Sequence, residues 1–432
     1  MKTDEPILQV ALDFVDIERA IQVAEEALAG GADWLEAGTP LIKSEGLNAV
    51  RALRQRFPQT TIVADMKTMD AGRAEVEVAA KAGANIIDVL GAASDATIRE
   101  CVEAANNYGA RIVVDMIEVR DPVERARAAE QAGAHYVSIH TAIDVQMRGG
   151  DPFERLKVVA NSVDIPVAVA GGINSETAAK AIENGASIVI VGGAITKSTD
   201  ARRAAEEIKQ AMLTGKAVAT NLFKRVDIDD VRDILKRVST ANISDAMHRT
   251  GEMEGIRPIV PGIKLAGPVI TVRTFPGDWS KPIQAIDLAQ PGDVLVIDVG
   301  GSYPAIWGEL ATHSAIQKGM EGVVIDGAIR DTPEIRALGF AAFSRLISPT
   351  AGEPKGFGEI NVPITAGGRR VFPGDWAVGD DDGIVIIPKA KVVEVANRAM
   401  DVLEKENRMR EEIERGSTLS KVGYLEKWDK KR

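Results

Sequence analysis

The sequence is poor in cysteine and has no excess of positive charge. Cys101 is the single cysteine among 432 residues. One cysteine excludes an intramolecular disulfide and a cysteine-built zinc site, which fits a reducing compartment. The sequence has 52 Lys and Arg residues and 63 Asp and Glu residues, which gives a net charge of −11. Because a nucleic-acid backbone normally requires a basic face, we expect no nucleic-acid partner.

Long apolar runs are also missing. No stretch approaches about 18 apolar residues, and the N-terminus MKTDEPILQV lacks the apolar core of about 7–15 residues that a signal peptide needs. We therefore expect no membrane segment and a soluble, cytoplasmic protein. Low-complexity tracts are absent, and the chain is longer than one core normally fills, so we expect two domains.

The first half contains a repeat of short β-branched runs, each followed by a helical pattern with apolar residues at i, i+3, i+4 and i+7. The spacing is about 25 residues, which is one strand, one helix and two turns. Five of the helical patterns end in Gly-Ala, and glycine is the expected left-handed stop of a helix. The runs begin at Ile7, Trp34, Thr61, Ile86, Arg111, Tyr136, Pro166 and Ile188. This strict alternation predicts a (β/α)8 TIM barrel over residues 1–212. A doubly wound sheet is the alternative, but eight near-equal units favour closure.

The pattern changes after residue 212. Residues 213–229 have no clean period and are predicted to be a linker. Beyond them the apolar runs lie closer together, with glycine and proline between them, so residues 230–432 are predicted to form a strand-rich α/β domain. Its last segment, AKVVEVANRAMDVLEKENRMREEIERG, is charged with a thin apolar stripe. We interpret this segment as a C-terminal assembly or packing helix of the second domain.

Chemically active side chains gather where the barrel strands are predicted to end. In this fold the loops after the strands form the active face. Asp65 and Lys67 are two residues apart, so both should point into the barrel mouth. Glu36 comes from the neighbouring strand, and two carboxylates there could share a hard cation such as Mg²⁺. The remaining strand ends carry Asp13, Asp88, Asp115, His140 and the pairs Gly171-Gly172 and Gly192-Gly193.

Each of these residues also has a purely structural interpretation. A lone acid at a strand end is more often a helix N-cap, and Asp115 could be only a structural acid. The glycine pairs could be tight turns, although they stand where barrels usually bind phosphate. His140 could be a core histidine, but it falls where a base would be needed. The coincidence of acids, lysine, histidine and paired glycines at one end favours a catalytic site.

The motif Asp65-x-Lys67-x-x-Asp70 resembles the orotidine 5′-phosphate decarboxylase superfamily, and the similarity covers essentially residues 1–212. The decarboxylase itself is metal-free and usually has an arginine where this sequence has Gly193. The segment SIHTAIDVQMRGGDP is more similar to 3-hexulose-6-phosphate synthase, with departures at Ala142 and Ile143. The related 3-keto-L-gulonate-6-phosphate decarboxylase carries an arginine at the position of Ile143 and remains the alternative.

This resemblance implies a Mg²⁺-dependent lyase that joins ribulose 5-phosphate to formaldehyde, or performs the reverse reaction, through an enediolate. Glu36 and Asp65 would hold the metal, His140 would remove a proton, and Lys67 would stabilise the oxyanion. It also implies an obligate dimer, in which Asp70 reaches the site of the partner subunit. The implied substrate-binding residues are Asp13, Gly171, Gly172, Gly192 and Gly193.

The second half carries another motif, Arg330-Asp331, within GELATHSAIQKGMEGVVIDGAIRDTPEI. With FPGDWAVGDDDGIVIIP, this segment resembles the family named for a regulator of ribonuclease activity, over residues 230–420. Its other members are class II pyruvate aldolases and oxaloacetate decarboxylases. The resemblance implies that Arg330 binds the carboxylate of a 2-oxo acid and that Asp331 positions Mg²⁺ through water.

Further roles follow from the same resemblance. Backbone N–H groups of the turn Gly308-Glu309-Leu310 would bind the same carboxylate, and Asp326 and Glu334 would complete the outer shell. The alternatives are a surface ion pair between Arg330 and Asp331 and a second domain that only assembles or regulates. We do not transfer the ribonuclease binding of that family to this chain.

Overall fold

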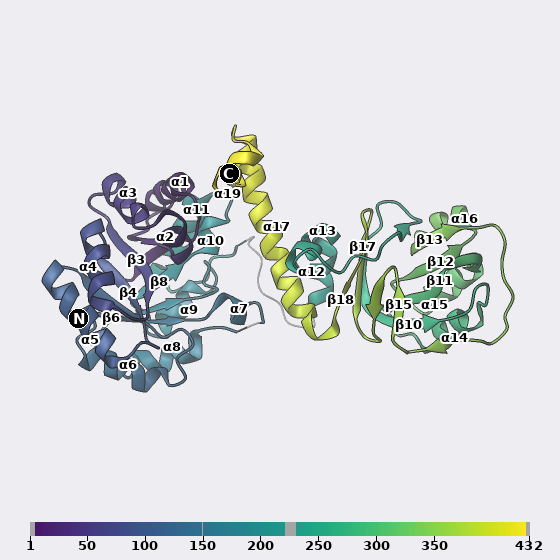
Figure 1. Cartoon of the computed structure of the whole chain (residues 1–432), viewed down its shortest axis with the longest axis horizontal. Helices are drawn as coiled ribbons and strands as arrows, with labels where there is room; N and C mark the ends of the chain where they lie inside the picture. Colours follow the sequence, from purple (N-terminus) through teal and green to yellow (C-terminus); the bar gives the residue numbers. More distant parts are fainter. Residues whose placement is uncertain (1–4, 149, 221–229, 429–432) are drawn as a thin grey trace. The chain divides into compact units, whose positions relative to one another are not determined.

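The computed structural model describes residues 5–148, 150–220 and 230–428, which form two compact units (Figure 1). The first unit combines residues 1–223 with residues 404–432, and the second spans residues 224–403. Most of the predicted linker, residues 221–229, lies outside the described residues. Residues 213 and 214, the first two of the predicted linker, are the end of the helix α11 (Ala201–Thr214). The barrel therefore extends slightly past the predicted boundary. In the described residues, no helix is long and apolar enough to cross a membrane.

The first unit is a closed barrel of eight parallel strands in the order β1 to β8, which confirms the predicted architecture. Closure comes from β8 pairing with β1, with Ile188 opposite Ile7. The strands are β1 (Ile7–Leu12), β2 (Trp34–Ala37), β3 (Thr61–Thr68), β4 (Ile86–Leu90), β5 (Arg111–Asp115), β6 (Tyr136–His140), β7 (Val167–Ala170) and β8 (Ile188–Val191).

The helices surround the strands (Figure 1). Three of them are short and directly follow a strand: α2 (Thr39–Glu45), α7 (Ile143–Gln146) and α10 (Gly193–Thr196). The other helices of the barrel are α1 (Ile17–Ala29), α3 (Asn48–Arg56), α4 (Gly72–Ala82), α5 (Asp95–Tyr108), α6 (Pro122–Gln131), α8 (Phe153–Ala160), α9 (Ala178–Glu183) and α11 (Ala201–Thr214).

The local sequence explains these boundaries. α4 and α5 end at Gly83 and Gly109, whose φ values of +109° and +68° strongly favour glycine, as the Gly-Ala pattern predicts. At their other ends, α1 and α5 begin after Asp16 and Ser94, whose side chains accept a backbone N–H of the first turn. Apolar side chains fill the barrel interior, with Trp34 edge-on to Tyr136 at 5.8 Å between ring centroids. The barrel is therefore a packed core, and chemistry is restricted to its open end.

The second unit is built on a mixed sheet in the order β18-β17-β10-β11-β12-β13-β9, with four parallel strands from β10 to β13 at its centre. Its strands are β9 (Arg257–Pro258), β10 (Leu265–Arg273), β11 (Val294–Trp307), β12 (Gly322–Ile329), β13 (Ala341–Ile347), β14 (Glu359–Ile360), β15 (Ile364–Ala366), β16 (Arg369–Val371), β17 (Trp376–Asp380) and β18 (Gly383–Ile387). Its helices are α12 (Val231–Arg237), α13 (Thr240–Ala246), α14 (Ser280–Leu288), α15 (Glu309–Gln317) and α16 (Thr332–Leu338), with a 3-10 turn, η1 (Lys389–Lys391). The predicted strand-rich α/β class is confirmed.

The last long helix, α17 (Val392–Glu414), differs from its prediction. The sequence analysis assigned all of it to the second domain, whereas residues from Glu404 onward belong to the barrel unit. The buried positions explain the division, because as far as Met400 they are apolar except for Asn397, and beyond it they are charged, at Arg408 and Glu412. Two short helices follow, α18 (Leu419–Val422) and α19 (Leu425–Trp428).

Candidate active site

The open end of the barrel holds a pocket whose lining combines apolar residues, such as Val63 and Ile86, with a group of ionisable side chains. Its polar lining includes Glu36, Asp65, Lys67, Asp88, Asp115 and His140. These side chains come from β2 to β6, so the strand ends bring together residues that are far apart in the sequence. Six of the strand-end residues singled out from the sequence therefore share one pocket.

Lys67 and Asp65 form the central ion pair of the pocket. Lys67 Nζ lies 2.8 Å and 2.9 Å from the two carboxylate oxygens of Asp65. Thr39, at the start of α2, donates its hydroxyl and its backbone N–H to Asp65 Oδ2 at 2.7 Å and 3.2 Å. Burial lowers the pKa of Lys67, but the charges of Asp65 and Asp88 raise it more, and the net pKa lies above its ordinary value. The ammonium is therefore charged and fixed.

The strand carrying this pair is not regular. Its pairing with β4 shifts between Ala64 and Thr68, and Lys67 has a φ of +48°. A non-glycine residue in the left-handed region is uncommon and is tolerated where its surroundings hold it. The two side chains meet as predicted, but the local backbone geometry is not that of an ideal strand.

His140 and Asp115 form a second pair. His140 Nδ1 lies 2.8 Å from Asp115 Oδ2, while Asp115 Oδ1 accepts the backbone N–H of Ile117 at 2.8 Å. Lys67 Nζ is 3.9 Å from Asp115 Oδ2, so the two pairs are neighbours. A histidine that donates Nδ1–H to a carboxylate presents Nε2 as a proton acceptor. The structure thus places Asp115 where it can orient His140.

Glu36 is buried at the centre of a group of carboxylates. Burial raises the pKa of Glu36 well above its ordinary value, and the charges of Asp65 and Asp13 raise it further. The amide of Gln9 donates to its Oε2 and opposes this effect. Asp88 is similar: burial and the neighbouring Asp115 and Asp65 raise its pKa, and its Oδ1 has no hydrogen-bond partner in the described residues.

Such a group of carboxylates suits a divalent cation, whose charge would relieve their mutual repulsion. Among the described residues, no three His, Cys, Asp or Glu side chains are arranged to hold a metal ion by themselves. Mg²⁺ does not require three, because it commonly binds one or two carboxylates and completes its shell with water and substrate oxygens. Glu36 and Asp65 are the carboxylates on adjacent strands that fit this role.

The glycine pairs lie at the ends of β7 and β8. Gly171 and Gly172 have φ values of +109° and +73°, and a Cβ on Gly171 would lie 2.7 Å from the carbonyl oxygen of Thr141. Gly193 begins the short helix α10, and a Cβ on Gly192 would lie 3.2 Å from Asp13 Oδ2. Bare backbone N–H groups at these two strand ends are in the usual phosphate position of the fold.

Asp13, Asp70 and the four glycines of the two pairs lie outside the pocket lining. Asp13 is exposed just after β1, where its carboxylate lies against Gly38 and Gly192. Asp70 is exposed in the loop between β3 and α4. Its role in a partner subunit stays a prediction.

In the second unit, Arg330 and Asp331 follow β12 at the start of α16. Asp331 Oδ2 accepts the backbone N–H of Glu309 at 3.1 Å and lies 3.4 Å from Arg330 Nε. A Cβ on Gly308 would lie 2.5 Å from Asp331 Oδ2, so a larger residue there would displace the carboxylate of Asp331. Leu310 is 80% exposed at the same turn. The predicted turn and the Arg-Asp pair are thus adjacent.

The expected outer shell is not formed by Asp326. Its carboxylate is bound by Arg345 and by the backbone N–H of Gly367, the latter at 2.7 Å, so it is a structural acid. Glu334 is exposed on α16. Neither residue contacts Arg330 or Asp331 through a hydrogen bond or ion pair described by the structure.

Sequence reasoning missed the supporting residues Gln9 and Thr39 and the pairing of Asp115. The sequence could have indicated a role for Gln9, because it is the one polar residue within the apolar run ILQVAL. Thr39 lies beyond its strand and had no comparable signal.

Both halves of the chain are similar to known protein families. Residues 6–208 match the model of the family described as orotidine 5′-phosphate decarboxylase / HUMPS, and residues 240–386 match the model described as Aldolase/RraA. The 3-hexulose-6-phosphate synthase of Bacillus subtilis (strain 168) is 42% identical over 209 residues, which is 48% of this chain and 99% of that protein. The chain belongs to the orotidine 5′-phosphate decarboxylase / HUMPS family.

Two solved structures are similar to parts of the chain. The 3-hexulose-6-phosphate synthase from Salmonella typhimurium is 37% identical, with a TM-score of 0.47, and the match covers 48% of this chain and 99% of that one. The RNA-processing inhibitor RraA from Thermus thermophilis is 29% identical, with a TM-score of 0.33, covering 35% of this chain and 93% of that one. By the two family matches, the orotidine 5′-phosphate decarboxylase / HUMPS domain accounts for about half of the chain, and it is fused to an RraA-like domain.

Proposed function

We propose that the barrel is a 3-hexulose-6-phosphate synthase, which adds ribulose 5-phosphate to formaldehyde or performs the reverse cleavage. The observation that carries this proposal is the pair His140–Asp115 beside the pair Lys67–Asp65 in one pocket. A base next to a fixed cation is what enolisation of a ketose requires. The identity of the barrel to named synthases supports the choice of substrate.

In this proposal His140 Nε2 takes a proton from C1 of ribulose 5-phosphate, and the electron pair of that C–H bond forms the enediolate. Asp115 holds the imidazole through Nδ1 and stabilises the imidazolium that results. Lys67 supplies positive charge beside the developing oxyanion. C1 then bonds to the carbon of formaldehyde, and the oxygen of formaldehyde takes up a proton to give 3-hexulose 6-phosphate.

Glu36 and Asp65 would hold Mg²⁺, which when bound supplies further positive charge for the enediolate oxygens. Gly171, Gly172 and Gly193 would present backbone N–H groups to the phosphate. We also propose a homodimeric barrel in which Asp70 completes the partner's site. A dimer in solution that dissociates or loses turnover in Asp70→Ala would support this arrangement.

The test is consumption of ribulose 5-phosphate and formaldehyde with Mg²⁺, measured for the full chain and for His140→Gln. His140→Gln should lose turnover by about 10²–10⁴-fold, the contribution of general base catalysis. The same preparations are given 3-keto-L-gulonate 6-phosphate. If that compound is the better substrate, the barrel is the related decarboxylase instead.

For the second domain we propose a Mg²⁺-dependent lyase acting on a 2-oxo acid, with Arg330 binding the carboxylate. The adjacency of Arg330, Asp331 and the N–H of Glu309 supports this proposal. Oxaloacetate should be decarboxylated with Mg²⁺, and Asp331→Ala should abolish the reaction while barrel turnover is retained. If no 2-oxo acid is turned over, the domain is an assembly or regulatory module.

A further inference from the structure

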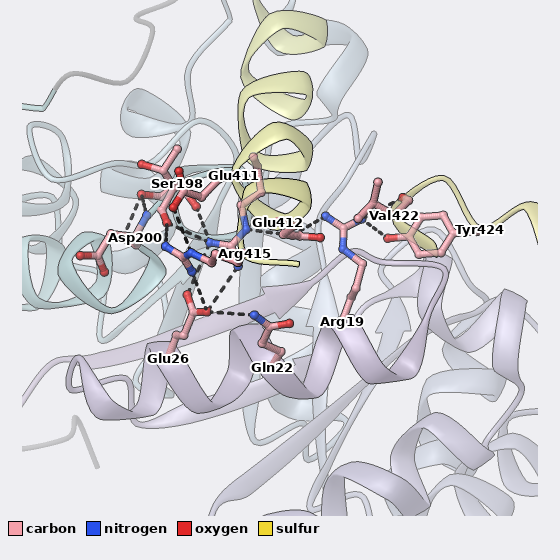
Figure 2. A network of polar contacts seen from close by, with 12 residues as sticks. Arg19, Gln22, Glu26, Ser198, Asp200, Glu411, Glu412, Arg415, Val422 and Tyr424 are labelled. Carbon is pink, nitrogen blue, oxygen red and sulfur yellow. Dashed lines mark hydrogen bonds and ion pairs between the residues drawn. The ribbon is translucent and has the colours of Figure 1, made fainter. Parts of the chain in front are cut away.

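After the second unit the chain returns to the barrel. Residues 404–428, named here the C-terminal strap, comprise the end of α17 with α18 and α19. Figure 2 shows the polar network that joins the strap to α1 and to the segment before α11. The strap lies outside the segment that matches the barrel family, so the family resemblance does not account for it.

Arg408 is the centre of this network. Its side chain is 2% exposed, and its Nε donates to Glu412 at 2.9 Å. One terminal nitrogen donates to the carbonyl oxygens of Ser198 and Thr199 at 2.9 Å and 3.2 Å. The other lies 3.4 Å from Glu26 on α1. Since Ser198 and Thr199 connect α10 to α11, Arg408 fixes the loop that follows the Gly192-Gly193 pair.

Arg19 makes the reverse connection, from the barrel to the strap. Its guanidinium binds Glu412 at 2.7 Å and also the hydroxyl of Tyr424 (Figure 2). It lies over the rings of Phe14 and Tyr424 at 5.4 Å and 5.3 Å from their centroids. Phe14 directly follows Asp13, so this contact holds the loop after β1.

The end of the strap meets the same loop again. Lys427 binds the carbonyl oxygen of Val15 and lies 3.5 Å from Asp16, the N-cap of α1. It also binds Glu45, the last residue of α2. The strap therefore contacts the segments after β1, β2 and β8. The first of these segments carries Asp13, and the last carries the Gly192-Gly193 pair.

We propose that the C-terminal strap is part of the sugar-phosphate site of the barrel, with Arg408 and Arg19 as positioning residues for the loops after β8 and β1. Two observations carry this proposal together. The fully buried Arg408 donates to two carbonyl oxygens of the segment after β8, and the contacted segments are those that carry Asp13 and the Gly192-Gly193 pair. The inference rests on the proposed function for its substrate, but the positioning of the loops is independent of it.

The test compares the full chain with its Arg408→Gln variant. Arg410→Gln is the matched control, because Arg410 lies on the same helix, is exposed and hydrogen-bonds to Asn407. Hydrogen exchange is followed in residues 13–17 and 192–200. We expect exchange there to be at least about tenfold faster in Arg408→Gln and unchanged in Arg410→Gln.

The kinetic readout is the KM for ribulose 5-phosphate, which should rise at least about fivefold in Arg408→Gln with a smaller change in kcat, since substrate binding is affected more than chemistry. Should Arg408→Gln fail to fold, Arg415→Gln is measured, because Arg415 also donates to Thr199, at 3.1 Å. Unchanged exchange, or an unchanged KM, overturns the proposal. Faster exchange in a protein whose parent form never turns over ribulose 5-phosphate supports the positioning role and refutes the proposed function instead.

Discussion

His140 Nδ1 lies 2.8 Å from Asp115 Oδ2, and this contact determines which ring nitrogen faces the substrate pocket. Asp115→Asn keeps the shape of the side chain but removes the carboxylate that holds the Nδ1 proton. We expect kcat to fall by about 10²–10⁴-fold with little change in KM, because the base is disoriented while phosphate binding is intact.

Steady-state kinetics of Asp115→Asn and His140→Gln check this expectation. Because the two residues act as a unit, the double variant should be about as slow as the slower single variant. If the fold-loss of kcat in the double variant equals the product of the two single losses, Asp115 acts separately from His140.

Glu36 gives a prediction about pH and stability. Its pKa in the folded protein lies well above the ordinary value of 4.5, through burial and the charges of Asp65 and Asp13. The folded state therefore binds a proton that the unfolded state has released, and stability falls as the pH rises above about 4.5. Glu36→Gln removes the ionisable group and therefore removes this fall in stability with rising pH.

We expect Glu36→Gln to raise the melting temperature in Mg²⁺-free buffer at pH 8 by about 2–4 °C, the shift produced by roughly 1 kcal/mol. The gain should shrink as the pH is lowered toward 4.5. Calorimetry from pH 5 to pH 8 measures it, with Glu103→Gln as the control because Glu103 is exposed. A gain that does not depend on pH would contradict the assignment.

Magnesium should stabilise the barrel through the same carboxylates. At a concentration one hundred times its dissociation constant, a bound ion adds about 2.7 kcal/mol to the free energy of unfolding. We therefore expect Mg²⁺ to raise the melting temperature of the barrel unit and EDTA to reverse the effect.

The measurement is made on an Asp331→Ala background, which removes the proposed site of the second domain. Adding Glu36→Gln to that background should abolish most of the shift. An equal shift with and without Glu36 would place the ion elsewhere.

Gly308 provides a prediction for the second domain. An added Cβ would lie 2.5 Å from Asp331 Oδ2, so Gly308→Ala should displace Asp331 and break its contact with the N–H of Glu309. We expect at least about a tenfold loss of Mg²⁺-dependent oxaloacetate turnover. Turnover of ribulose 5-phosphate by the same chain is the internal control and should not change.

The barrel could be predicted closely from its sequence because its signal is local and repeated. Seven of the eight strands begin at the predicted residue, and the β7 strand begins one residue later, at Val167. Proline at position 166 explains the difference, since it has no N–H for the strand ladder. The positions of Asp65, Lys67 and His140 at predicted strand ends likewise indicated that these side chains lie together at the open end of the barrel.

The contacts that could not be predicted join residues whose local patterns are unrelated. Asp115 could be a structural acid or a catalytic partner, and only its distance to His140 decides between them. In α17 the spacing of apolar residues predicts a helix, but not that Arg408 and Glu412 are buried against α1. Buried charge pairs depend on partners hundreds of residues away, which periodicity does not encode.

The strap also sets an order of events during synthesis. Residue 404 leaves the ribosome about 190 residues after α11 ends at Thr214. At about 5–20 residues per second this interval is about 10–40 s. The second unit, residues 224–403, is therefore made in full before the barrel can form its last contacts. During that time Arg19 lacks its contacts with Glu412 and Tyr424, and Glu26 lacks its contacts with Arg408 and Arg415.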